Sequence, residues 1–285
     1  MFYIRRRWLR DRAALPPGKV EPLQPTHQNP LIQKLHHLFP LTPEEEHVLE
    51  QACSRTAQFG ADEDIVVEGD RPSDCNLLLE GIVCRYKLVA DGRRQIMSFH
   101  CAGDIFDAQS FILHRMDHSI GTLTPCKVAL IPHGTMLSMT ENFPRIARAI
   151  WKDTLVDAAI FREWMTSIGR RSAYARIAHL LCEQYVKMQT VGLAKDHQFP
   201  WPITQAEIGD ALGLSNVHVN RTLQELRSAD LLTFKGGWLK IDDWEGLKAA
   251  GEFDPEYLHL RPAEGAARTG RSGNSHRPIA GPVAG

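Results

Sequence analysis

The chain has 285 residues, of which 43% are hydrophobic and 24% are charged, and its formal net charge is −1. This length and composition are typical of a globular protein with two domains, each large enough to bury a core. The balanced charge excludes a chain that is basic throughout, so any nucleic-acid-binding surface has to be local.

The two ends of the chain are expected to lack structure. Residues 1–29 carry four prolines and little periodicity, which predicts a disordered basic tail. The far end is rich in Gly, Ala, Pro and Arg, so we expect a second disordered tail over residues 247–285, with a non-specific DNA-contacting arm as the alternative. The sequence has no apolar run of about 18 residues, and its start lacks the apolar core of a signal peptide. We therefore expect a cytoplasmic protein with no membrane partner.

The folded part begins with a helical pattern. Leu31, Leu35 and Leu38 share one helical face. Residues 42–45 (Thr-Pro-Glu-Glu) then form a capping box with proline at the first helical position, which predicts the start of a helix that runs to Cys53.

Short β segments follow within residues 30–143, which we expect to form the first domain. Between Ile65 and Ile131, runs such as NLLLEGIVCRYKLV, RQIMSFH and CKVALIP are bounded by glycines and predict strands. Asp91-Gly92 stands between two of these runs and predicts a type I′ hairpin turn, which needs positive φ at both positions. Several short strands at regular spacing indicate a sandwich or barrel.

From Pro144 the apolar residues follow the period of an α-helix, and we expect one long helix over residues 144–170. Large apolar side chains recur at every fourth position of this helix, at Val156, Ile160, Trp164 and Ile168. A second copy of the same helix would cover part of this stripe. We therefore predict that these four residues form the interface of a symmetric homodimer.

Residues 171–246 contain two short helical patterns separated by a glycine. Thr204 and Glu207 form a capping box that opens the first, Gly213 supplies a left-handed residue after it, and Ser215 caps the second. Two helices joined by a short glycine-containing turn are typical of a helix-turn-helix, whose second helix enters the major groove. A helical hairpin with a solvated polar face is the alternative.

The segment after the second helix favours the DNA-binding interpretation. Residues 231–241 (LLTFKGGWLKI) predict a hairpin with a Gly-Gly turn, or wing, whose lysines could reach phosphates. Residues 216–240 carry a local net charge of +2. The candidate DNA-binding residues are Thr204, Gln205, Ser215, Asn216, Val217, His218, Asn220, Arg221 and Lys235.

Over residues 31–244 the chain resembles the cyclic-AMP receptor / fumarate-nitrate regulator (Crp/Fnr) superfamily of transcriptional regulators. The matching segments are Glu68-Gly69-Asp70, Leu79-Glu80-Gly81, Asp91-Gly92-Arg93, residues 101–105 (Cys-Ala-Gly-Asp-Ile) and the recognition segment through Arg221. The resemblance implies an α+β protein with an N-terminal cyclic-nucleotide-binding-like β-roll (jelly roll), a long dimerisation helix and a C-terminal winged helix-turn-helix.

The resemblance also implies a function. It indicates a bacterial transcription factor that binds an inverted-repeat operator in double-stranded DNA as a homodimer and is set by an effector or redox signal at the β-roll. RNA polymerase is a further implied partner, as for an activator, although activation and repression both stay open. Many relatives carry Glu at the position of Val217, paired with an Arg at the position of Arg221. Valine can only touch a thymine methyl, so we expect a different base pair there.

The chain departs from the cyclic-AMP-binding members at the residues that hold the phosphate. Those members carry Gly-Glu-Leu and later an Arg-Ser pair, whereas this chain has Gly-Asp-Ile at residues 103–105 and Met116-Asp117 where the pair is expected. An aspartate at this position repels the cyclic phosphate, and the site lacks the arginine that would neutralise it, so we expect no cyclic-AMP binding. Arg115, one residue away, keeps the question open.

Other cofactors also lack their usual ligands. No cysteine precedes Cys53, whereas the iron–sulfur cluster of the oxygen-sensing members needs four thiolates. His114 and His118 are four residues apart, but no third metal ligand stands out. We expect no metal and no cofactor, with the effector unknown. Four cysteines in the expected β-roll are interpreted as small buried hydrophobes, with a thiol redox switch as the alternative: Cys75, Cys84, Cys101 and Cys126.

Two other functions compete with a transcription factor. A cyclic-nucleotide-binding regulatory subunit or enzyme module loses its support with the missing Arg-Ser pair. An enzyme on a cupin-like β-roll typically needs two histidines and a carboxylate inside the barrel, and the strand segments offer only His100 and His118. We therefore expect a regulator without enzymatic activity.

Overall fold

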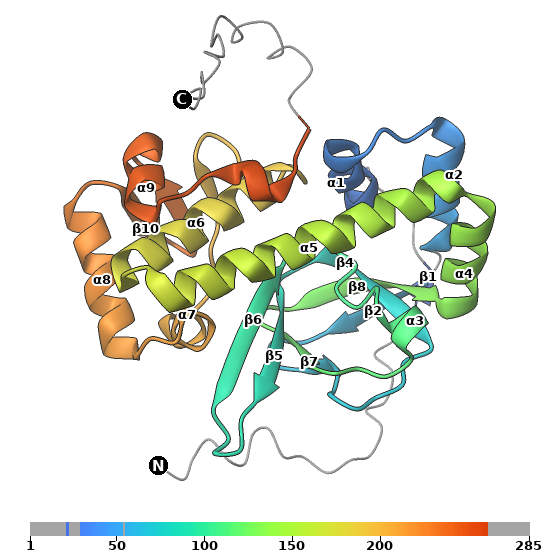
Figure 1. The fold of residues 1–285 in the computed structure, drawn as a ribbon, viewed down its shortest axis with the longest axis horizontal. Coiled ribbons are helices and arrows are strands. Elements are labelled where there is room, and N and C mark those ends of the chain that lie inside the picture. The colour runs from blue at the N-terminus through green and yellow to red at the C-terminus, as the bar shows by residue number, and fades with distance from the viewer. Residues whose placement is uncertain (1–20, 23–28, 54, 262–285) are drawn as a thin grey trace, which may run out of the picture.

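The computed structural model describes residues 21–22, 29–53 and 55–261. The long helix α5 (Pro144–Arg170) crosses the molecule, with a β-roll against one part of its length and a winged helix-turn-helix at the other end (Figure 1). This arrangement is the expected α+β architecture. Within the described ranges, none of the helices combines the length and the apolar composition that a membrane crossing needs.

Two helices precede the β-roll, α1 (Pro30–Leu38) and α2 (Pro43–Ala52). The capping box predicted for α2 is confirmed: the Thr42 hydroxyl accepts from the Glu45 N–H, and the Glu45 carboxylate accepts from the Thr42 N–H at 2.8 Å. Residues 1–20 and 23–28 of the expected N-terminal tail lie outside the described residues. Glu21–Pro22 forms the short strand β1, so the expectation of disorder is wrong for these two residues.

The β-roll consists of two antiparallel sheets, with strand orders β1-β2-β8-β4 and β3-β7-β5-β6. The strands are β2 (Arg55–Phe59), β3 (Asp64–Val66), β4 (Asp74–Glu80), β5 (Val83–Leu88), β6 (Arg94–His100), β7 (Ser119–Thr122) and β8 (Cys126–Pro132). The sequence patterns missed β2 and β7, and they joined β4 to β5. Two short helices, α3 (Ser110–Leu113) and α4 (His133–Asn142), complete this part of the chain.

The hairpin between β5 and β6 forms as predicted, but its turn differs. Only Gly92 has positive φ, at +82°, and the loop closes through a hydrogen bond from the Val89 N–H to the Arg93 carbonyl at 2.9 Å. The predicted type I′ turn is therefore wrong. The Asp91 carboxylate accepts from the Arg93 N–H at 3.0 Å, a local bond that stabilises the longer loop.

The long helix forms over the expected residues, but its expected dimer stripe faces inward. Val156, Ile160 and Trp164 are at most 8% exposed within one protomer, and only Ile168 is exposed, at 38%. Four residues advance an α-helix by roughly 40° beyond a full turn, so a stripe of every fourth residue winds from the inner to the outer face. Three of the four side chains are thus already covered by the protomer's own core.

The winged helix begins with α6 (Ala173–Gln189) and β9 (Gln198–Pro200). It continues through α7 (Gln205–Leu212), α8 (Asn216–Ser228), β10 (Leu232–Lys235), β11 (Trp238–Ile241) and α9 (Trp244–Gly251), and ends in the short helix η1 (Pro255–Leu258). The expected disorder from residue 247 onward is therefore wrong up to Arg261, because Leu247, Phe253 and Leu258 are buried against the core. Residues 262–285 of that expected tail lie outside the described residues.

One hydrophobic cluster extends from α1 through the β-roll to the winged helix. Phe99 of β6 belongs to this cluster, and its ring lies 5.8 Å from that of Trp164 and 6.4 Å from that of Trp201, both in edge-on arrangements. This cluster fixes the winged helix against the sensor through shared aromatic packing.

Candidate nucleic-acid interface and sensor cavity

The helix-turn-helix is held by the local bonds that the sequence predicted. The Thr204 hydroxyl accepts from the Glu207 N–H, and the Glu207 carboxylate accepts from the Thr204 N–H at 2.7 Å. Gly213 ends α7 in the left-handed conformation with φ +66°. The Ser215 hydroxyl then accepts from the His218 N–H and starts α8.

Helix α8 buries one face and exposes the other. Val219, Leu223 and Leu226 are buried, whereas Val217 is 81% exposed. Asn216 and Arg221 are exposed beside Val217, as the groove-facing assignment requires. Gln224, which was not among the candidate residues, is also exposed. Its spacing of three residues from Arg221 and seven from Val217 places it on the same face and could have revealed it.

Two of the candidate side chains, Asn220 and Gln205, contact each other. The Asn220 amide donates to Gln205 Oε1 at 3.1 Å, which joins α8 to the first turn of α7. The Arg221 guanidinium lies 3.6 Å from the Glu225 carboxylate on the next turn of α8. The first pair links the two helices, whereas the second is an exposed ion pair within α8.

The wing lies next to this face. Gly236 and Gly237 both have positive φ, at +59° and +79°, so the predicted two-residue turn is confirmed. Lys235 pairs with Trp238 across the turn, and both are exposed at the tip of the β10–β11 hairpin.

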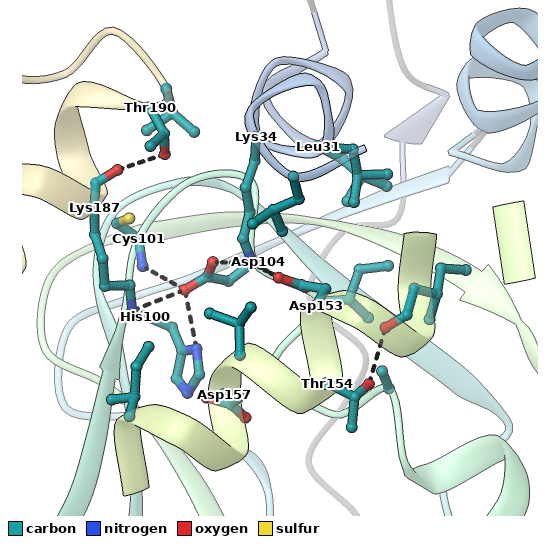
Figure 2. A pocket seen from close by; sticks show the side chains of 18 of the residues that line it. Leu31, Lys34, His100, Cys101, Asp104, Asp153, Thr154, Asp157, Lys187 and Thr190 are labelled. Atoms are coloured by element: carbon teal, nitrogen blue, oxygen red, sulfur yellow. Dashed lines mark hydrogen bonds and ion pairs between the residues drawn. The ribbon is translucent and has the colours of Figure 1, made fainter. Parts of the chain in front are cut away.

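A second site lies between the β-roll, α1, α5 and α6, where a cavity of about 80 Å³ is lined by charged and apolar side chains (Figure 2). Asp104 lies at its centre and is buried. Its carboxylate lies 2.7 Å from Lys34 Nζ, 3.4 Å from Lys187 Nζ and 3.0 Å from His100 Nδ1. Lys34 also pairs with Asp153 of α5 at 2.6 Å.

The pKa shifts in this cavity follow from its ion pairs. Burial alone would raise the pKa of Asp104, but Lys187 and Lys34 hold it well below its ordinary value. Burial alone would lower the pKa of Lys34, but Asp104 and Asp153 raise it overall. The charged forms of Asp104 and the lysines therefore stabilise one another.

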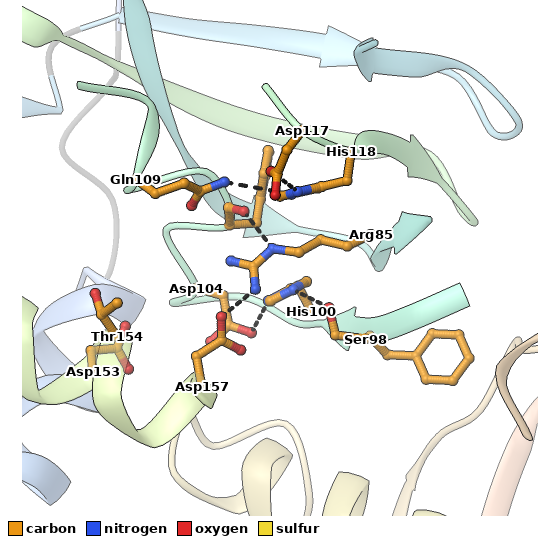
Figure 3. A network of polar contacts seen from close by, with 12 residues as sticks. Arg85, Ser98, His100, Asp104, Gln109, Asp117, His118, Asp153, Thr154 and Asp157 are labelled. Atoms are coloured by element: carbon orange, nitrogen blue, oxygen red, sulfur yellow. Dashed lines mark hydrogen bonds and ion pairs between the residues drawn. The ribbon is translucent and has the colours of Figure 1, made fainter. Parts of the chain in front are cut away.

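Arg85 lies deeper in the β-roll and also reaches α5. Its guanidinium donates to the Phe106 carbonyl at 2.9 Å and to the Asp157 carboxylate (Figure 3). Burial and the nearby Arg85 lower the pKa of His100 to about 4, so this imidazole is neutral at neutral pH. The second ring nitrogen of His100 contacts the Ser98 hydroxyl at 2.8 Å.

The residues at the expected Arg-Ser position do not form a phosphate site. Met116 is buried in the β-roll core, and Asp117 is exposed and pairs with His118 at 2.7 Å. His114 caps α3 in a left-handed conformation, with its side chain exposed. Over residues 29–53 and 55–261, no group of three or more His, Cys, Asp or Glu side chains could hold a metal ion.

All six cysteines are buried. Burial raises the pKa of every thiol, to about 11 in Cys53 and to about 12 in Cys75, Cys84, Cys101 and Cys182; Cys126 is raised as well. The thiolate is the reactive form, so these environments favour the interpretation as small buried hydrophobes over a redox switch.

Helices α6 and α7 of the winged helix make charged and polar contacts with the β-roll. Arg94 of β6 pairs with Asp210 of α7 at 2.9 Å, and the Gln95 amide donates to the Ala211 carbonyl at 3.1 Å. Lys187 of α6 donates to the Phe99 carbonyl at 2.8 Å in addition to its pairing with Asp104. The sensor therefore holds α7, while α8 stays exposed.

The buried neutral His100 makes stability depend on pH. Because its folded-state pKa of about 4 is below the ordinary 6.5, the unfolded chain takes up a proton first as the pH falls. The wild type should lose on the order of 2 kcal/mol of unfolding free energy, relative to a His100→Gln variant, between pH 6.5 and 4. Urea unfolding at several pH values measures this difference. The exposed His37→Gln control should keep the wild-type slope, and a His100→Gln variant with that slope would contradict the assignment.

Two family models match the chain, "Cyclic nucleotide-binding domain" over residues 56–143 and "Crp-like helix-turn-helix domain" over residues 175–250. The nitrogen fixation regulation protein FixK of Bradyrhizobium diazoefficiens is 30% identical over 190 residues, which cover 66% of this chain and 78% of that protein. The fumarate and nitrate reduction regulatory protein of Yersinia pestis is 23% identical over 219 residues, covering 76% and 86%.

Among solved structures, FixK2 from Bradyrhizobium japonicum is 25% identical and superposes with a TM-score of 0.62, covering 68% of this chain and 96% of that one. The β-roll and the winged helix-turn-helix of the structure coincide with the two matched domains, in the same order. The chain belongs to the Crp/Fnr family of DNA-binding transcriptional regulators.

Proposed function

We propose that the protein binds an inverted-repeat operator as a homodimer and reads each half-site with α8. The observation that carries this proposal is the exposed face of α8 beside the lysine-bearing wing. Two recognition helices related by a two-fold axis require half-sites spaced by about 10–10.5 bp, one turn of the DNA helix. The domains that serve this function are residues 30–143, the dimerisation helix 144–170 and the winged helix, which we extend to Arg261.

Within a half-site the side chains have different roles. Arg221 is the candidate for a bidentate contact with guanine, and Val217 is the candidate for a thymine methyl. Gln224 adds a third reader on the same face. Phosphate contacts position the protein without reading bases. We assign them to residues near the helix N-termini and in the wing: Thr204, Gln205, Ser215 and Lys235. Asn216, His218 and Asn220 contact neighbouring bases or phosphates.

The dimer interface is proposed on the outer face of α5. Trp151, Leu155 and Met165 are 65%, 53% and 75% exposed, although all three are large apolar residues. Together with Ala158 and Arg162 they recur at spacings of four, three, four and three residues, the spacing of the apolar seam in paired helices. A second copy of α5 is therefore the occupant that fits, with Ile168 at the edge of the seam.

The sensor is proposed to respond to an effector other than cyclic AMP. The regulator is proposed to act without a bound metal or iron–sulfur cluster and to have no enzymatic activity. The Asp104 carboxylate already pairs with Lys34 and Lys187. The cavity of about 80 Å³ is also smaller than the roughly 300–1,000 Å³ of small-molecule pockets. RNA polymerase is the proposed further partner, and the cytoplasm, where bacterial DNA lies, is the proposed location. Sequencing the genomic DNA that the purified protein retains tests the function directly.

Base reading and phosphate contact can be separated by mutation. Arg221→Ala should cost about 1–3 kcal/mol on the operator and relax the preference at one base pair per half-site. Lys235→Ala should weaken all sequences alike and lower the salt slope by about one. Binding titrations on operator variants at several salt concentrations measure both effects. Arg227→Ala, in the last turn of α8, serves as the control, and unchanged operator discrimination in Arg221→Ala would refute this docking.

The proposed seam predicts which substitutions produce monomers. Trp151→Glu with Leu155→Glu should dissociate the dimer, because the seam would then bury like charges from both copies. The protomer should stay folded, since both side chains are exposed in it. Sedimentation gives the mass, and Leu137→Glu on α4, an exposed leucine outside the seam, should remain dimeric. If the double variant remains a dimer, the interface does not lie along this seam.

The cavity chemistry predicts that cyclic AMP does not bind. Calorimetry at about millimolar nucleotide should give no saturable heat, because the phosphate would have to displace Asp104 from Lys34 and Lys187. Saturable binding that is lost in Arg115→Ala would contradict this expectation.

A further inference from the structure

Residues 252–261, which we call the strap, lie beyond both matched domains. The strap leaves α9, follows α5 and ends beside α1, so it runs from the DNA-binding part back to the sensor (Figure 1). Its apolar side chains are part of the main core: Phe253 and Leu258 are buried, and Leu260 is partly buried against the same cluster.

The middle of the strap is fixed by a buried carboxylate. The Tyr257 hydroxyl donates to Glu183 Oε2 at 2.8 Å and contacts His179 Nε2 at 3.1 Å. Glu183 is fully buried on α6 and also accepts from the Trp164 indole N–H of α5 at 3.0 Å. The strap, α6 and α5 therefore share one hydrogen-bonded group, whose loss on any side leaves a buried polar atom without its partner.

The far end of the strap is fixed to α1. The Arg261 backbone N–H donates to the His37 carbonyl at 2.7 Å, and its guanidinium donates to the His36 carbonyl at 3.3 Å. These carbonyls belong to the last turn of α1, where helical partners are lacking. Leu258 and Leu260 of the strap line the same cavity as Lys34 of α1, which pairs with Asp104. The strap therefore borders this cavity.

The winged helix has a short covalent connection to α5, residues 171–172 between α5 and α6. A two-residue connection alone leaves the angle between the two helices adjustable. The contacts of α6 and α7 with the sensor restrain this angle, and the strap adds a further connection: Tyr257 fixes it to α6, and Arg261 bonds to α1. A rotation of the winged helix against α1 therefore has to break or stretch the Arg261 bonds in addition to the contacts of α6 and α7 with the sensor.

We propose that the strap is a positioning element that sets the distance and angle between the two recognition helices and thereby selects the half-site spacing. This inference rests on the proposed binding of paired half-sites by a dimer joined along α5. Each base pair of misspacing turns one half-site by roughly 35° about the DNA axis, which a fixed pair of winged helices cannot follow.

The test uses symmetric operators whose half-site centres are about 9 to 13 bp apart, together with a single half-site. The full chain should lose on the order of tenfold in affinity for each base pair of misspacing. Truncation after Asp254 removes the strap from Pro255 onward, and it should reduce that loss to about threefold or less, with single half-site affinity kept within about twofold. Truncation after Arg261 is the matched control, since it keeps the strap, and it should retain the full discrimination.

A second pair of variants decides the outcome if the truncated chain does not fold. Tyr257→Phe keeps the ring but removes the hydroxyl that contacts Glu183 and His179. It should reduce the loss of affinity per base pair of misspacing by about threefold. Tyr174→Phe, at a partly buried tyrosine in the first turn of α6, should leave that preference unchanged. Sedimentation and thermal unfolding confirm that each variant is a folded dimer.

The outcomes separate the two proposals. A wild type that binds a single half-site as well as any paired operator would refute the paired half-site function. A wild type that selects one spacing, with a folded strap-less or Tyr257→Phe dimer that selects it equally well, would overturn the strap proposal alone.

Discussion

The arrangement of sensor and winged helix depends on the buried carboxylate of Asp104. It receives Lys34 from α1 and Lys187 from α6, so one group of the β-roll binds two elements outside it. Desolvating these charges is expensive, and only the complete set compensates for it, so removal of a single partner from such a cluster typically costs about 3–5 kcal/mol. Position 104 thus holds together parts of the chain that are distant in sequence.

Helix α5 is the common surface on which this arrangement is built. Its inner face carries Asp153 and Asp157, which pair with Lys34 and Arg85, and its buried Trp164 contacts both Phe99 and Glu183. Its outer face keeps Trp151, Leu155 and Met165 exposed. A change in the sensor that moves the contacts of Asp153 and Asp157 therefore acts on the same helix, α5, that carries the proposed dimer seam.

Most local signals in the sequence were reliable where one or two residues decide the geometry, although the Asp91-Gly92 turn is not the predicted type I′. The capping boxes at Thr42 and Thr204, the left-handed Gly213 and the Gly-Gly wing turn all formed as expected, because each depends on bonds within a few residues. Burial could not be assigned in the same way. Three residues of the expected dimer stripe on α5 are buried within one protomer, and residues 247–261 are folded although disorder was expected, because tertiary partners decide both. The ion pairs of Asp104 join residues 34, 104 and 187, and no local pattern connects these positions.

The exposure of α8 constrains how such a regulator can be controlled. The sensor contacts α7 through Arg94 and Gln95 and leaves the outer face of α8 exposed in this structure. What remains adjustable is the orientation of the winged helix, and a ligand shifts an orientation only by binding two states with different affinities. Lys187 links the two parts directly, because it belongs to α6 and pairs with Asp104 and with the Phe99 carbonyl of the β-roll.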